Sequence, residues 1–520
     1  MKGLSFVGIG ISGTSICVLL LASVLLIAVP ALAMAEEGGT YPMFHYDAQR
    51  TGNVSGDAPM TNQISWSTYI GGLVDSSPII SDGKVFVSNW FAEWYGGVNG
   101  LYCLNETTGE ILWNNSLGGS GGASTASISG DKLFVGSLAG NLYCINASSG
   151  ETIWSKRIEH SPAYSGVASS PLVYENLVFV TTFSNNASNN GTLHVLDFNG
   201  SELWNLSTGD TFYYTSPAIA DGNVFFAGNL TNHTLYCVNI STHNILWLFN
   251  TSTQIKSTPA IWNNTVFFAS ANKMYAVNIT DGKELWNNSF SCVMSSPAVS
   301  NGRIFVGSGN GRLYCYNADD GSERWNTTVN GPIHSSSVVA NNTIYFGTNT
   351  ADGTIYALNA TDGTLRWSYT LNPPSGSYYN IMSSPAVADG ILFIGADDGR
   401  IHAFSPSGAN ITSFTIESVS SKKGHRFTAR LNITTSSDAV NGWYVVVASG
   451  VNADGSSLAG IGTVYLNSND TVNLMPVLIH VPPLAESGEY ELYAGLYRLN
   501  NYPYVLMDSE GPIDVTVTVG

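Results

Sequence analysis

Short apolar stretches recur along residues 75–408, separated by turns rich in Asn, Asp and Gly. The clearest copy is residues 296–325, SPAVSNGRIFVGSGNGRLYCYNADDGSERW. In its apolar stretch, Ile304 and Val306 would face one side of a strand and Phe305 the other, so both sides are apolar and both are expected to be buried. A fixed period of this kind predicts a series of small β-sheets packed against one another.

Eight Trp residues mark the ends of the repeats, at intervals of 39 to 50 residues, which suits four short strands with turns. They are Trp66, Trp113, Trp154, Trp204, Trp247, Trp286, Trp325 and Trp367. Eight repeat starts also exist, at Pro78, Ala126, Pro171, Pro217, Pro259, Pro297, Ser337 and Pro385.

The two series are out of phase, since Trp66 precedes every start and no Trp follows the last start at Pro385. We therefore expect the strand around Trp66 to complete the last sheet. Sharing one sheet between the two ends of the repeat region closes a ring and removes two unpaired sheet edges. The sequence predicts an all-β, eight-bladed β-propeller closed by an N-terminal strand.

Turn sequences support the hairpins within each blade. Asp82-Gly83 and Asn301-Gly302 are typical of the turn between the first two strands, and Asp320-Gly321 of the turn between the last two. Asn or Asp before Gly suits the positive φ angles that tight hairpins require. These carboxylates could bind calcium, but turn chemistry accounts for them.

Charge limits the possible partners. The chain has 19 basic and 37 acidic residues, a net charge of −18. Phosphate-rich partners need clustered Lys and Arg, so we expect neither nucleic acid nor an anionic membrane surface as partner.

The N-terminus has the layout of an export signal: Lys2, an apolar run over residues 16–33, and small residues up to Ala35 ahead of Glu36. Residues 1–35 are interpreted as a signal peptide. The alternative is an uncleaved anchor, because the run is long enough to span a bilayer, and that would be the only membrane contact. Frequent Asn-X-Ser/Thr triplets suit a secreted or cell-surface glycoprotein, with Asn105, Asn146, Asn278 and Asn359 as possible glycosylation sites.

The motif G-x-L-Y-x-x-N-A-x-x-G-x-x-x-W occurs at residues 140–154 and 311–325. It resembles the blade motif of the PQQ-like β-propellers, the group that includes quinoprotein alcohol dehydrogenases and BamB-like assembly proteins. The resemblance covers about residues 41–408, and residues 41–52 are similar to the segment that opens many exported members.

For a quinoprotein, the resemblance implies a disulfide between adjacent cysteines and a calcium ion held by Glu, Asn and Asp. This chain has no Cys-Cys pair, and the acids expected to point inward are few: Asp75, Glu159 and Asp210. Cys103, Cys144, Cys237 and Cys315 share one repeat position and are expected to be buried free thiols, with Cys292 solitary. We expect no cofactor, with PQQ and calcium as the less favoured alternative. The dispersed histidines, such as His160 and His334, are interpreted as surface polar residues.

Aromatic residues gather in the loops that enter the first strand of a blade and in those that join its second and third strands, which the strand order places on one face. The candidate partner-binding residues are Trp90, Phe91, Trp94, Tyr95, Tyr164, Phe212, Tyr213, Tyr214, Tyr378 and Tyr379. Exposed aromatics with little charge around them are typical of protein or carbohydrate recognition. Alternatively, these rings fill the central channel or pack on one another.

After residue 408 the repeat stops. Alternating strands expected at residues 413–419, 426–434, 443–449, 472–481, 490–498 and 513–519 predict a second domain over residues 411–520, an immunoglobulin-like β-sandwich.

The function expected from these features is a non-catalytic extracellular or cell-envelope scaffold that binds an envelope or extracellular protein or glycan through the aromatic face. The alternative is an enzyme at the channel mouth, either a PQQ-dependent oxidoreductase or a polysaccharide lyase.

Overall fold

The structure is a computed structural model that describes residues 39–520 except 57, 60, 96, 120, 123, 161–164, 185–190, 214, 229–231, 375–376, 405–408, 417–419, 423–425, 436–441, 452–456, 467–470, 481–487, 499–504 and 519–520. The expected signal peptide at residues 1–35 lies outside this part of the chain. Among the described residues, no helix combines the length and the apolar character that crossing a membrane requires.

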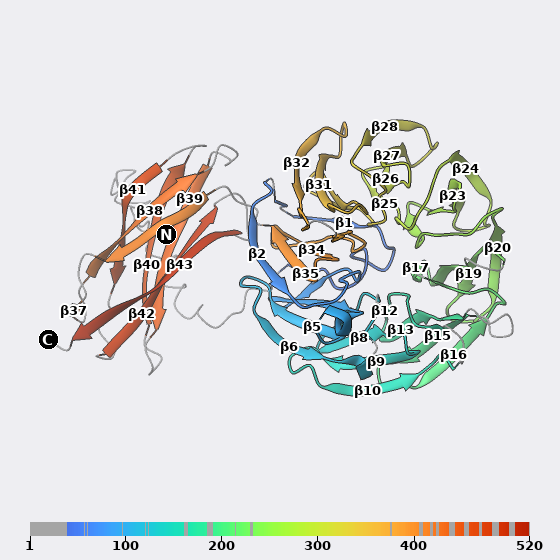
Figure 1. Cartoon of the computed structure of the whole chain (residues 1–520), viewed down its shortest axis with the longest axis horizontal. Coiled ribbons are helices and arrows are strands. Elements are labelled where there is room, and N and C mark those ends of the chain that lie inside the picture. The colour runs from blue at the N-terminus through green and yellow to red at the C-terminus, as the bar shows by residue number, and fades with distance from the viewer. Residues whose placement is uncertain are drawn as a thin grey trace, which may run out of the picture. The chain divides into compact units, whose positions relative to one another are not determined.

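Eight four-stranded antiparallel sheets form the blades of a propeller (Figure 1), which confirms the predicted architecture. Blade 1 contains β3 (Ile79–Ser81), β4 (Lys84–Asn89), β5 (Gly100–Asn105) and β6 (Ile111–Asn115); blade 2 contains β7 (Ser127–Ser129), β8 (Lys132–Gly136), β9 (Asn141–Asn146) and β10 (Thr152–Arg157). Blade 3 contains β12 (Leu172–Tyr174), β13 (Leu177–Thr181), β15 (Thr192–Asp197) and β16 (Glu202–Ser207); blade 4 contains β17 (Ala218–Ala220), β18 (Asn223–Ala227), β19 (Thr234–Asn239) and β20 (Ile245–Asn250). Blade 5 contains β21 (Ala260–Trp262), β22 (Thr265–Ala269), β23 (Lys273–Asn278) and β24 (Glu284–Ser289); blade 6 contains β25 (Ala298–Ser300), β26 (Arg303–Gly307), β27 (Arg312–Asn317) and β28 (Glu323–Thr328). Blade 7 contains β29 (Val338–Ala340), β30 (Thr343–Gly347), β31 (Thr354–Asn359) and β32 (Leu365–Thr370); blade 8 contains β33 (Ala386–Ala388), β34 (Ile391–Ala396), β35 (Arg400–Phe404) and β2 (Ile64–Tyr69).

The N-terminal strand closes the ring as predicted. Strand β2 pairs antiparallel with β35, and Trp66 lies opposite Ala403. The propeller also contains shorter elements. Strand β1 (Asn53–Val54) pairs parallel with β29, and β11 (Ser165–Gly166) pairs with β14 (Phe183–Ser184). Two short segments, η1 (Ala92–Tyr95) and η2 (Leu117–Gly119), are 3-10 helices.

The repeat Trp residues join neighbouring blades. Each of six indoles donates from Nε1 to a backbone carbonyl, at 2.8 to 3.2 Å: Trp66 to Glu106, Trp113 to Ala147, Trp154 to Phe198, Trp247 to Ile279, Trp286 to Ala318, and Trp367 to Pro59. The Gly in the last turn of the following blade lies close to the indole. A Cβ added at Gly321, for example, would be only 2.6 Å from the Trp286 indole. The turn Gly therefore provides close approach as well as a positive φ.

One blade departs from this rule in an informative way. His243 replaces the turn Gly with φ of 60°, and its ring stacks on Trp204 with centroids 4.6 Å apart. The imidazole of His243 thus packs on the Trp204 indole, whereas in other blades the backbone of the turn Gly lies against the indole.

The small residue at the start of each repeat forms a closed circle of hydrogen bonds. A backbone N–H in each blade donates to the side-chain hydroxyl of the equivalent residue in the next blade, at 2.9 to 3.2 Å. The circle runs through Ser77, Thr125, Ser170, Ser216, Thr258, Ser296, Ser336 and Ser384 and returns to Ser77. All eight blades are therefore tied together next to the ring axis.

The leader, residues 39–54, winds around the axis and contacts every blade, which the sequence did not predict. Its backbone bonds the middle residue of six innermost strands at 2.8 to 3.0 Å: Ile80, Ile128, Ile219, Ile261, Val299 and Val339. Arg50 reaches blade 3 by donating to the carbonyls of Ser170 and Pro171 at 3.3 Å, and the Gly39 N–H donates to Asp389 in blade 8. The leader ends at β1, which lies among the innermost strands (Figure 1).

After the propeller, the described strands are β36 (Ala409–Ile416), β37 (Ser420–Lys422), β38 (Arg426–Thr435), β39 (Gly442–Val451), β40 (Ser457–Leu466), β41 (Thr471–His480), β42 (Gly488–Arg498) and β43 (Val505–Thr518). Strands occur in all six expected regions, and β37 and β40 were not expected. Hydrogen bonds order them as one sheet, β36-β38-β41-β40-β39-β42-β43-β37. The assignment as an immunoglobulin-like sandwich domain stays a prediction.

Candidate binding face on the loop side of the ring

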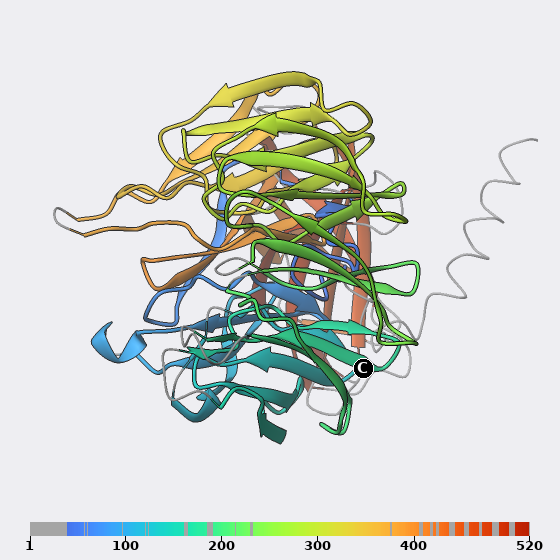
Figure 2. The ribbon, with the colours of Figure 1, turned by 90° about the vertical axis from the view of Figure 1, so that its right-hand side faces the viewer.

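The strand order gives the propeller two different faces. The loop face carries the segments that enter the first strand of each blade and those that join its second and third strands; the turn face carries the remaining, shorter turns. Both η1 and the segment between β32 and β33 project from the same side of the ring (Figure 2). The segment between β32 and β33 contains Tyr378 and Tyr379, while η1 contains Trp94 and Tyr95 and directly follows Trp90 and Phe91.

Trp90 and Phe91 form a built aromatic pair. Trp90 Nε1 donates to Asp75 Oδ2 at 2.7 Å, and its backbone pairs with Leu73, so the indole is fixed. The ring of Phe91 packs on it with centroids 4.4 Å apart and is 46% exposed. Phe91 has φ of 55°, a conformation that costs an L-residue free energy and that neighbouring structure must enforce.

Asp75 also contacts a second carboxyl group, that of Asp397. The Oδ1 atoms of both are buried and accept no hydrogen bond from any donor in the described part of the chain. Burial and the neighbouring charge of Asp75 raise the pKa of Asp397 to about 8, and burial raises the pKa of Asp75. A proton held on Asp397 satisfies both oxygens, because the protonated carboxyl can donate to the ionised one.

Contacts continue from this pair to the aromatic residues of blade 8. The N–H of Asp397 donates to the carbonyl of Asn380 at 3.0 Å, and the N–H of Tyr379 donates to Ala351 at 2.8 Å. Tyr378 is 69% exposed, and Tyr379 is partly buried. Contacts thus connect Phe91 through Trp90, Asp75 and Asp397 to Asn380, and Tyr378 lies two residues before Asn380 in the chain.

Other expected binding residues are placed differently. Phe212 is a correction: it was expected at the surface, but it is fully buried and packs edge-on against Phe226 in the core. Tyr213 is partly buried and meets Phe183 edge-on at 4.6 Å. For Phe212 and Tyr213 the alternative interpretation applies, because each ring packs on another aromatic ring.

Four further candidates are Trp94, Tyr95, Tyr164 and Tyr214. Trp94 and Tyr95 lie in η1, and Tyr164 and Tyr214 lie outside the described residues.

The four possible glycosylation sites end the third strand of their blades, where the Asn side chain also stabilises the turn. Asn105 Oδ1, for example, accepts the N–H groups of Thr107 and Thr108 at 2.9 Å. Glycosylation stays a prediction.

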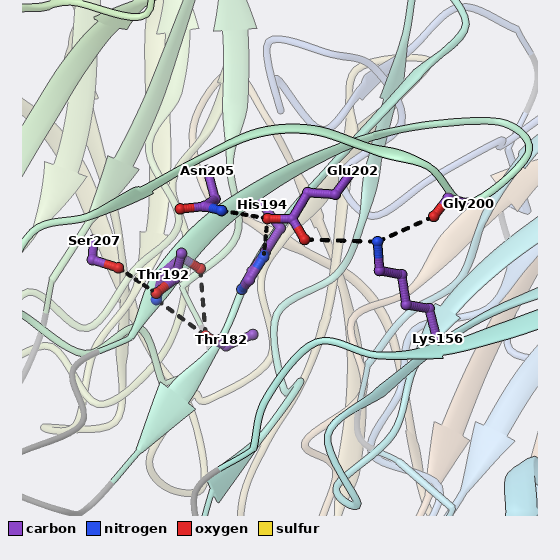
Figure 3. A network of polar contacts seen from close by, with 8 residues as sticks. All are labelled: Lys156, Thr182, Thr192, His194, Gly200, Glu202, Asn205 and Ser207. Carbon is purple, nitrogen blue, oxygen red and sulfur yellow. Dashed lines mark hydrogen bonds and ion pairs between the residues drawn. The ribbon is translucent and has the colours of Figure 1, made fainter.

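Other polar clusters in the propeller connect residues within one blade or between neighbouring blades. His194 Nδ1 lies 3.3 Å from Glu202 Oε1, whose other oxygen is 3.7 Å from Lys156 Nζ in the neighbouring blade (Figure 3). Asn205 donates to the same Oε1 at 2.6 Å. Burial lowers the pKa of His194, while Glu202 opposes that shift.

A similar cluster joins Ser67, His402 and Asp398, with 3.1 Å from Ser67 Oγ to His402 Nδ1 and 2.9 Å from Nε2 to Asp398. Ser67 and His402 are simply paired across β2 and β35. His402 occupies the same repeat position as His194, the third residue of its strand, where other blades have Tyr. Ser67, His402 and Asp398 are the residue types of a hydrolase triad, but their arrangement here follows from cross-strand pairing at a repeat position.

Within the described residues, no group of three or more His, Cys, Asp or Glu side chains is arranged to hold a metal ion. The five described cysteines are buried free thiols, and four of them lie opposite the repeat Trp of the adjacent strand, as in Cys103 opposite Trp113. Burial raises their pKa values to about 11 or 12, so these thiols are unreactive packing groups.

Solved structures share this fold. A europium-containing methanol dehydrogenase aligns with TM-score 0.60 and 14% identity over 70% of this chain and 91% of its own. The quinohemoprotein alcohol dehydrogenase of Comamonas testosteroni aligns with TM-score 0.59 and 13% identity over 72% and 81%. The computationally designed Ika8 protein aligns with TM-score 0.53 and 17% identity over 66% and 99%. No curated protein matches the sequence.

A family model described as outer membrane protein assembly factor BamB matches residues 98–211, 189–291 and 275–461. These ranges overlap and together cover more than half of the chain. The chain therefore belongs to the BamB-like family of PQQ-like β-propellers.

Proposed function

We propose that the protein is an exported, non-catalytic binding or assembly scaffold, and that its partner is an envelope or extracellular protein or glycan that binds the loop face around Phe91 and Tyr378. The observation that carries this proposal is the backbone of Phe91. An exposed aromatic ring is held at φ of 55° on an indole that is itself hydrogen-bonded to Asp75. Strain of this kind persists where the surroundings enforce it, and such places are often binding sites.

The chemistry of the surface also favours recognition. Phe91 and Tyr378 are rigid rings, which gain contact area on binding and lose little conformational entropy. Their mobility is limited further by the anchored Trp90 and by the hydrogen-bonded backbone of Tyr379. A partner would therefore meet a surface that is largely formed in advance.

Export and assembly are supported by the family and by the N-terminal pattern. The matching family model carries the name of an outer membrane protein assembly factor. Residues 1–35 have the charge, apolar run and small residues of a signal peptide. With a net charge of −18, the chain has little capacity for nucleic acid.

Site-specific photo-crosslinking in the native envelope tests the proposal. A benzoylphenylalanine at position 91 or 378 should form a specific crosslinked product, and the same residue at position 203 should not. Leu203 is the matched control, because it is an exposed apolar residue, 54% exposed, on the outermost strand of blade 3.

Affinity measurements then weigh the individual rings. Once the crosslinked partner is identified, Phe91→Ala combined with Tyr378→Ala should weaken its binding at least about tenfold, since buried aromatic anchors dominate interfaces. Trp90→Ala with Trp94→Ala should have a similar effect, and Leu203→Ala none. Equal crosslinking from positions 91 and 203, or full binding by the double variants, would overturn the proposal.

A further inference from the structure

Tyr69 and Arg400 form an exposed pair of an aromatic ring and a cation. The two residues are opposite each other on β2 and β35, and the Arg400 guanidinium lies over the Tyr69 ring, 5.7 Å from its centroid. Tyr69 is 47% exposed, and Arg400 is partly buried. Nη1 of Arg400 donates to the carbonyl of Ser67 at 3.1 Å, so the guanidinium is fixed beside the ring.

The pair lies at the loop-face end of blade 8. The first strand of a blade runs from the loop face to the turn face, so the third strand, β35, begins at the loop face and the fourth strand, β2, ends there. In blades 2 to 7 the equivalent cross-strand pairs contain no aromatic ring: Asn141–Arg157, Thr192–Ser207, Thr234–Asn250, Lys273–Ser289, Arg312–Thr328 and Thr354–Thr370. Blade 8 therefore departs from the repeat at this position.

Backbone contacts join the pair to the proposed binding face on both sides. Residues 69–73 lead to blade 1, where Leu73 exchanges two backbone hydrogen bonds with Trp90, at 2.8 and 3.1 Å. On the other side, the turn before β35 contacts Asn380, whose carbonyl accepts the N–H of Asp397 at 3.0 Å. The pair therefore connects to both aromatic segments of that face.

The charge of Arg400 is not balanced by a carboxylate in the described part of the chain. Apart from the carbonyl of Ser67, its guanidinium has no hydrogen-bond acceptor and no ion-pair partner there. The carboxylate of Asp398 is held by other groups, because it accepts the backbone N–H of Arg400 at 2.9 Å and lies 2.9 Å from His402 Nε2. Most N–H donors of the guanidinium are therefore available to an anion.

A carboxylate suits this cation, because the planar guanidinium can donate two parallel hydrogen bonds to its two oxygens. Tyr and Arg are also the residue types that dominate the binding energy of protein interfaces. A polyanionic glycan would be repelled by the net charge of −18, whereas a protein can present one carboxylate on an otherwise neutral or basic surface. Charge and residue type together favour a protein partner.

We propose that Tyr69 and Arg400 form a subsite of the loop face that binds the side-chain carboxylate of an Asp or Glu residue of a protein partner. This inference rests on the proposed function, because it names the charge that the partner presents at that face. Arg400 donates to both carboxylate oxygens, and the Tyr69 ring holds the plane of the guanidinium.

A small carboxylate tests the subsite in the full-length protein without the partner. The Nε–H resonance of Arg400, identified by its loss in Arg400→Lys, is followed by NMR at constant ionic strength. The α-amide of N-acetylglutamate should shift this resonance in proportion to the amount bound. The amide of N-acetylglutamine, which has the same shape and no charge, should not shift it, because a charged acceptor makes the stronger hydrogen bonds.

Arg312 is the matched control for the small probes. It begins the third strand of blade 6, as Arg400 does in blade 8, but it bonds Asn326 and is opposite Thr328 instead of an aromatic ring. Its resonance should stay in place with either probe. No shift at Arg400, or equal shifts with the two probes or at the two arginines, would overturn the subsite.

Capture tests the same residues with the partner. Purified protein with benzoylphenylalanine at position 91 is crosslinked to an envelope fraction, and the yield should fall at least about fivefold in Arg400→Gln and in Tyr69→Ala. Arg400→Lys keeps the charge without the planar fork and should give an intermediate yield, and Arg312→Gln should give the native yield. The urea midpoint of each variant shows whether it is folded.

Chemical blocking of the partner avoids any change in the protein itself. Amidation of carboxylates in the envelope fraction, with a water-soluble carbodiimide and methylamine, should lower capture by the native protein to the yield of Arg400→Gln. Undiminished capture after amidation, or a captured glycan in place of a protein, would overturn the subsite.

The subsite and the proposed function can fail separately. A probe shift at Arg400 with no crosslinked product at position 91 would refute the proposed scaffold surface and leave the carboxylate subsite standing. A crosslinked product that responds neither to Arg400→Gln nor to amidation would refute the subsite and support the scaffold surface.

Discussion

The backbone N–H of Ser384 donates to Ser77 Oγ at 3.1 Å, and this bond joins the last blade to the first across 307 residues of sequence. It is the closing member of the hydroxyl circle. Because both groups are buried, neither can exchange its partner for water when the bond is broken. The circle therefore stabilises the closed ring specifically.

Ser77→Ala should destabilise the protein by about 1 to 3 kcal/mol, because the N–H of Ser384 is left buried without an acceptor. The measurement is the urea midpoint of unfolding. Ser335→Ala is the matched control: Ser335 is equally buried, but its Oγ has no hydrogen-bond partner among the described residues. That variant should be neutral or more stable. Equal losses in the two variants would show that the bond contributes nothing beyond packing.

The repeat Trp residues allow a similar comparison. Trp286 Nε1 donates to the carbonyl of Ala318 at 3.0 Å, whereas Trp325 Nε1 is buried without an acceptor in the described part of the chain. The equivalent carbonyl in blade 7, that of Ala360, accepts from Arg303 instead, at 3.1 Å. Trp286→Phe should therefore cost about 1 kcal/mol more than Trp325→Phe. Thermal unfolding of both variants checks the difference, and a larger loss in Trp325→Phe would contradict it.

Turn glycines separate backbone strain from close approach. Gly321 and Gly222 have nearly the same φ, 71° and 70°, but a Cβ at Gly321 would be 2.6 Å from the Trp286 ring and a Cβ at Gly222 would meet nothing within 4 Å. Gly222→Ala should cost about 1 kcal/mol for the left-handed backbone alone. Gly321→Ala should cost about 1 to 3 kcal/mol more, from overpacking. Similar unfolding midpoints would mean that the indole moves aside freely.

Much of the fold could be predicted because the repeat encodes it locally. The Trp spacing, the Asn-Gly and Asp-Gly turns and the offset of Trp66 all act within one blade or between neighbours. The same local reasoning gave the two faces of the ring. Local reasoning could not predict that these hydroxyl groups bond in a closed circle, since each Ser or Thr looks like a small packing residue in its own repeat.

The leader and the binding face were harder for a different reason. The leader has no period, and its path depends on positive φ at ordinary residues such as His45 and Tyr46. In the loops, an exposed ring and a buried one have the same sequence signature. Phe212 is buried because its ring packs on Phe226 in the core, whereas Phe91 is 46% exposed, and that difference depends on the tertiary structure.

The carboxyl pair under Trp90 predicts a pH dependence. The pKa of Asp397 is raised from 3.8 to about 8 in the folded protein, so between these values the folded state holds a proton that the unfolded state has lost. Its contribution to stability is therefore fully present at low pH and is lost as the pH rises through about 8. Asp397→Asn should show a smaller fall in melting temperature than the native protein between pH 6.5 and 8.

This window avoids the opposite effect of His45, whose pKa is lowered from 6.5 to about 4 and whose contribution changes below pH 6.5. Asp319→Asn, at an exposed turn position, is the control and should keep the native slope. Parallel pH profiles for the native protein and Asp397→Asn would refute the shared proton.

Arg50 should be the most sensitive residue of the leader. It is fully buried, and its guanidinium donates to the carbonyls of Phe44, Ser170, Pro171 and Pro217. Burial lowers the pKa of Arg50 to about 9, so carbonyl dipoles, with some help from the charge of Asp47, hold the cation in place.

Arg50→Met keeps much of the volume but leaves these buried carbonyls without their donor, and it should reduce stability by about 3 kcal/mol or more, measured from urea unfolding. Arg312→Met is the matched control, because Arg312 is exposed and makes one bond of 3.2 Å to Asn326, and it should change stability by less than about 0.5 kcal/mol. If the leader acts as a strap around the axis, hydrogen exchange in Arg50→Met should rise at Ile219, Ile261 and Val299, whose N–H groups bond the leader. Faster exchange in the outer strands alone would show that the ring holds together without it.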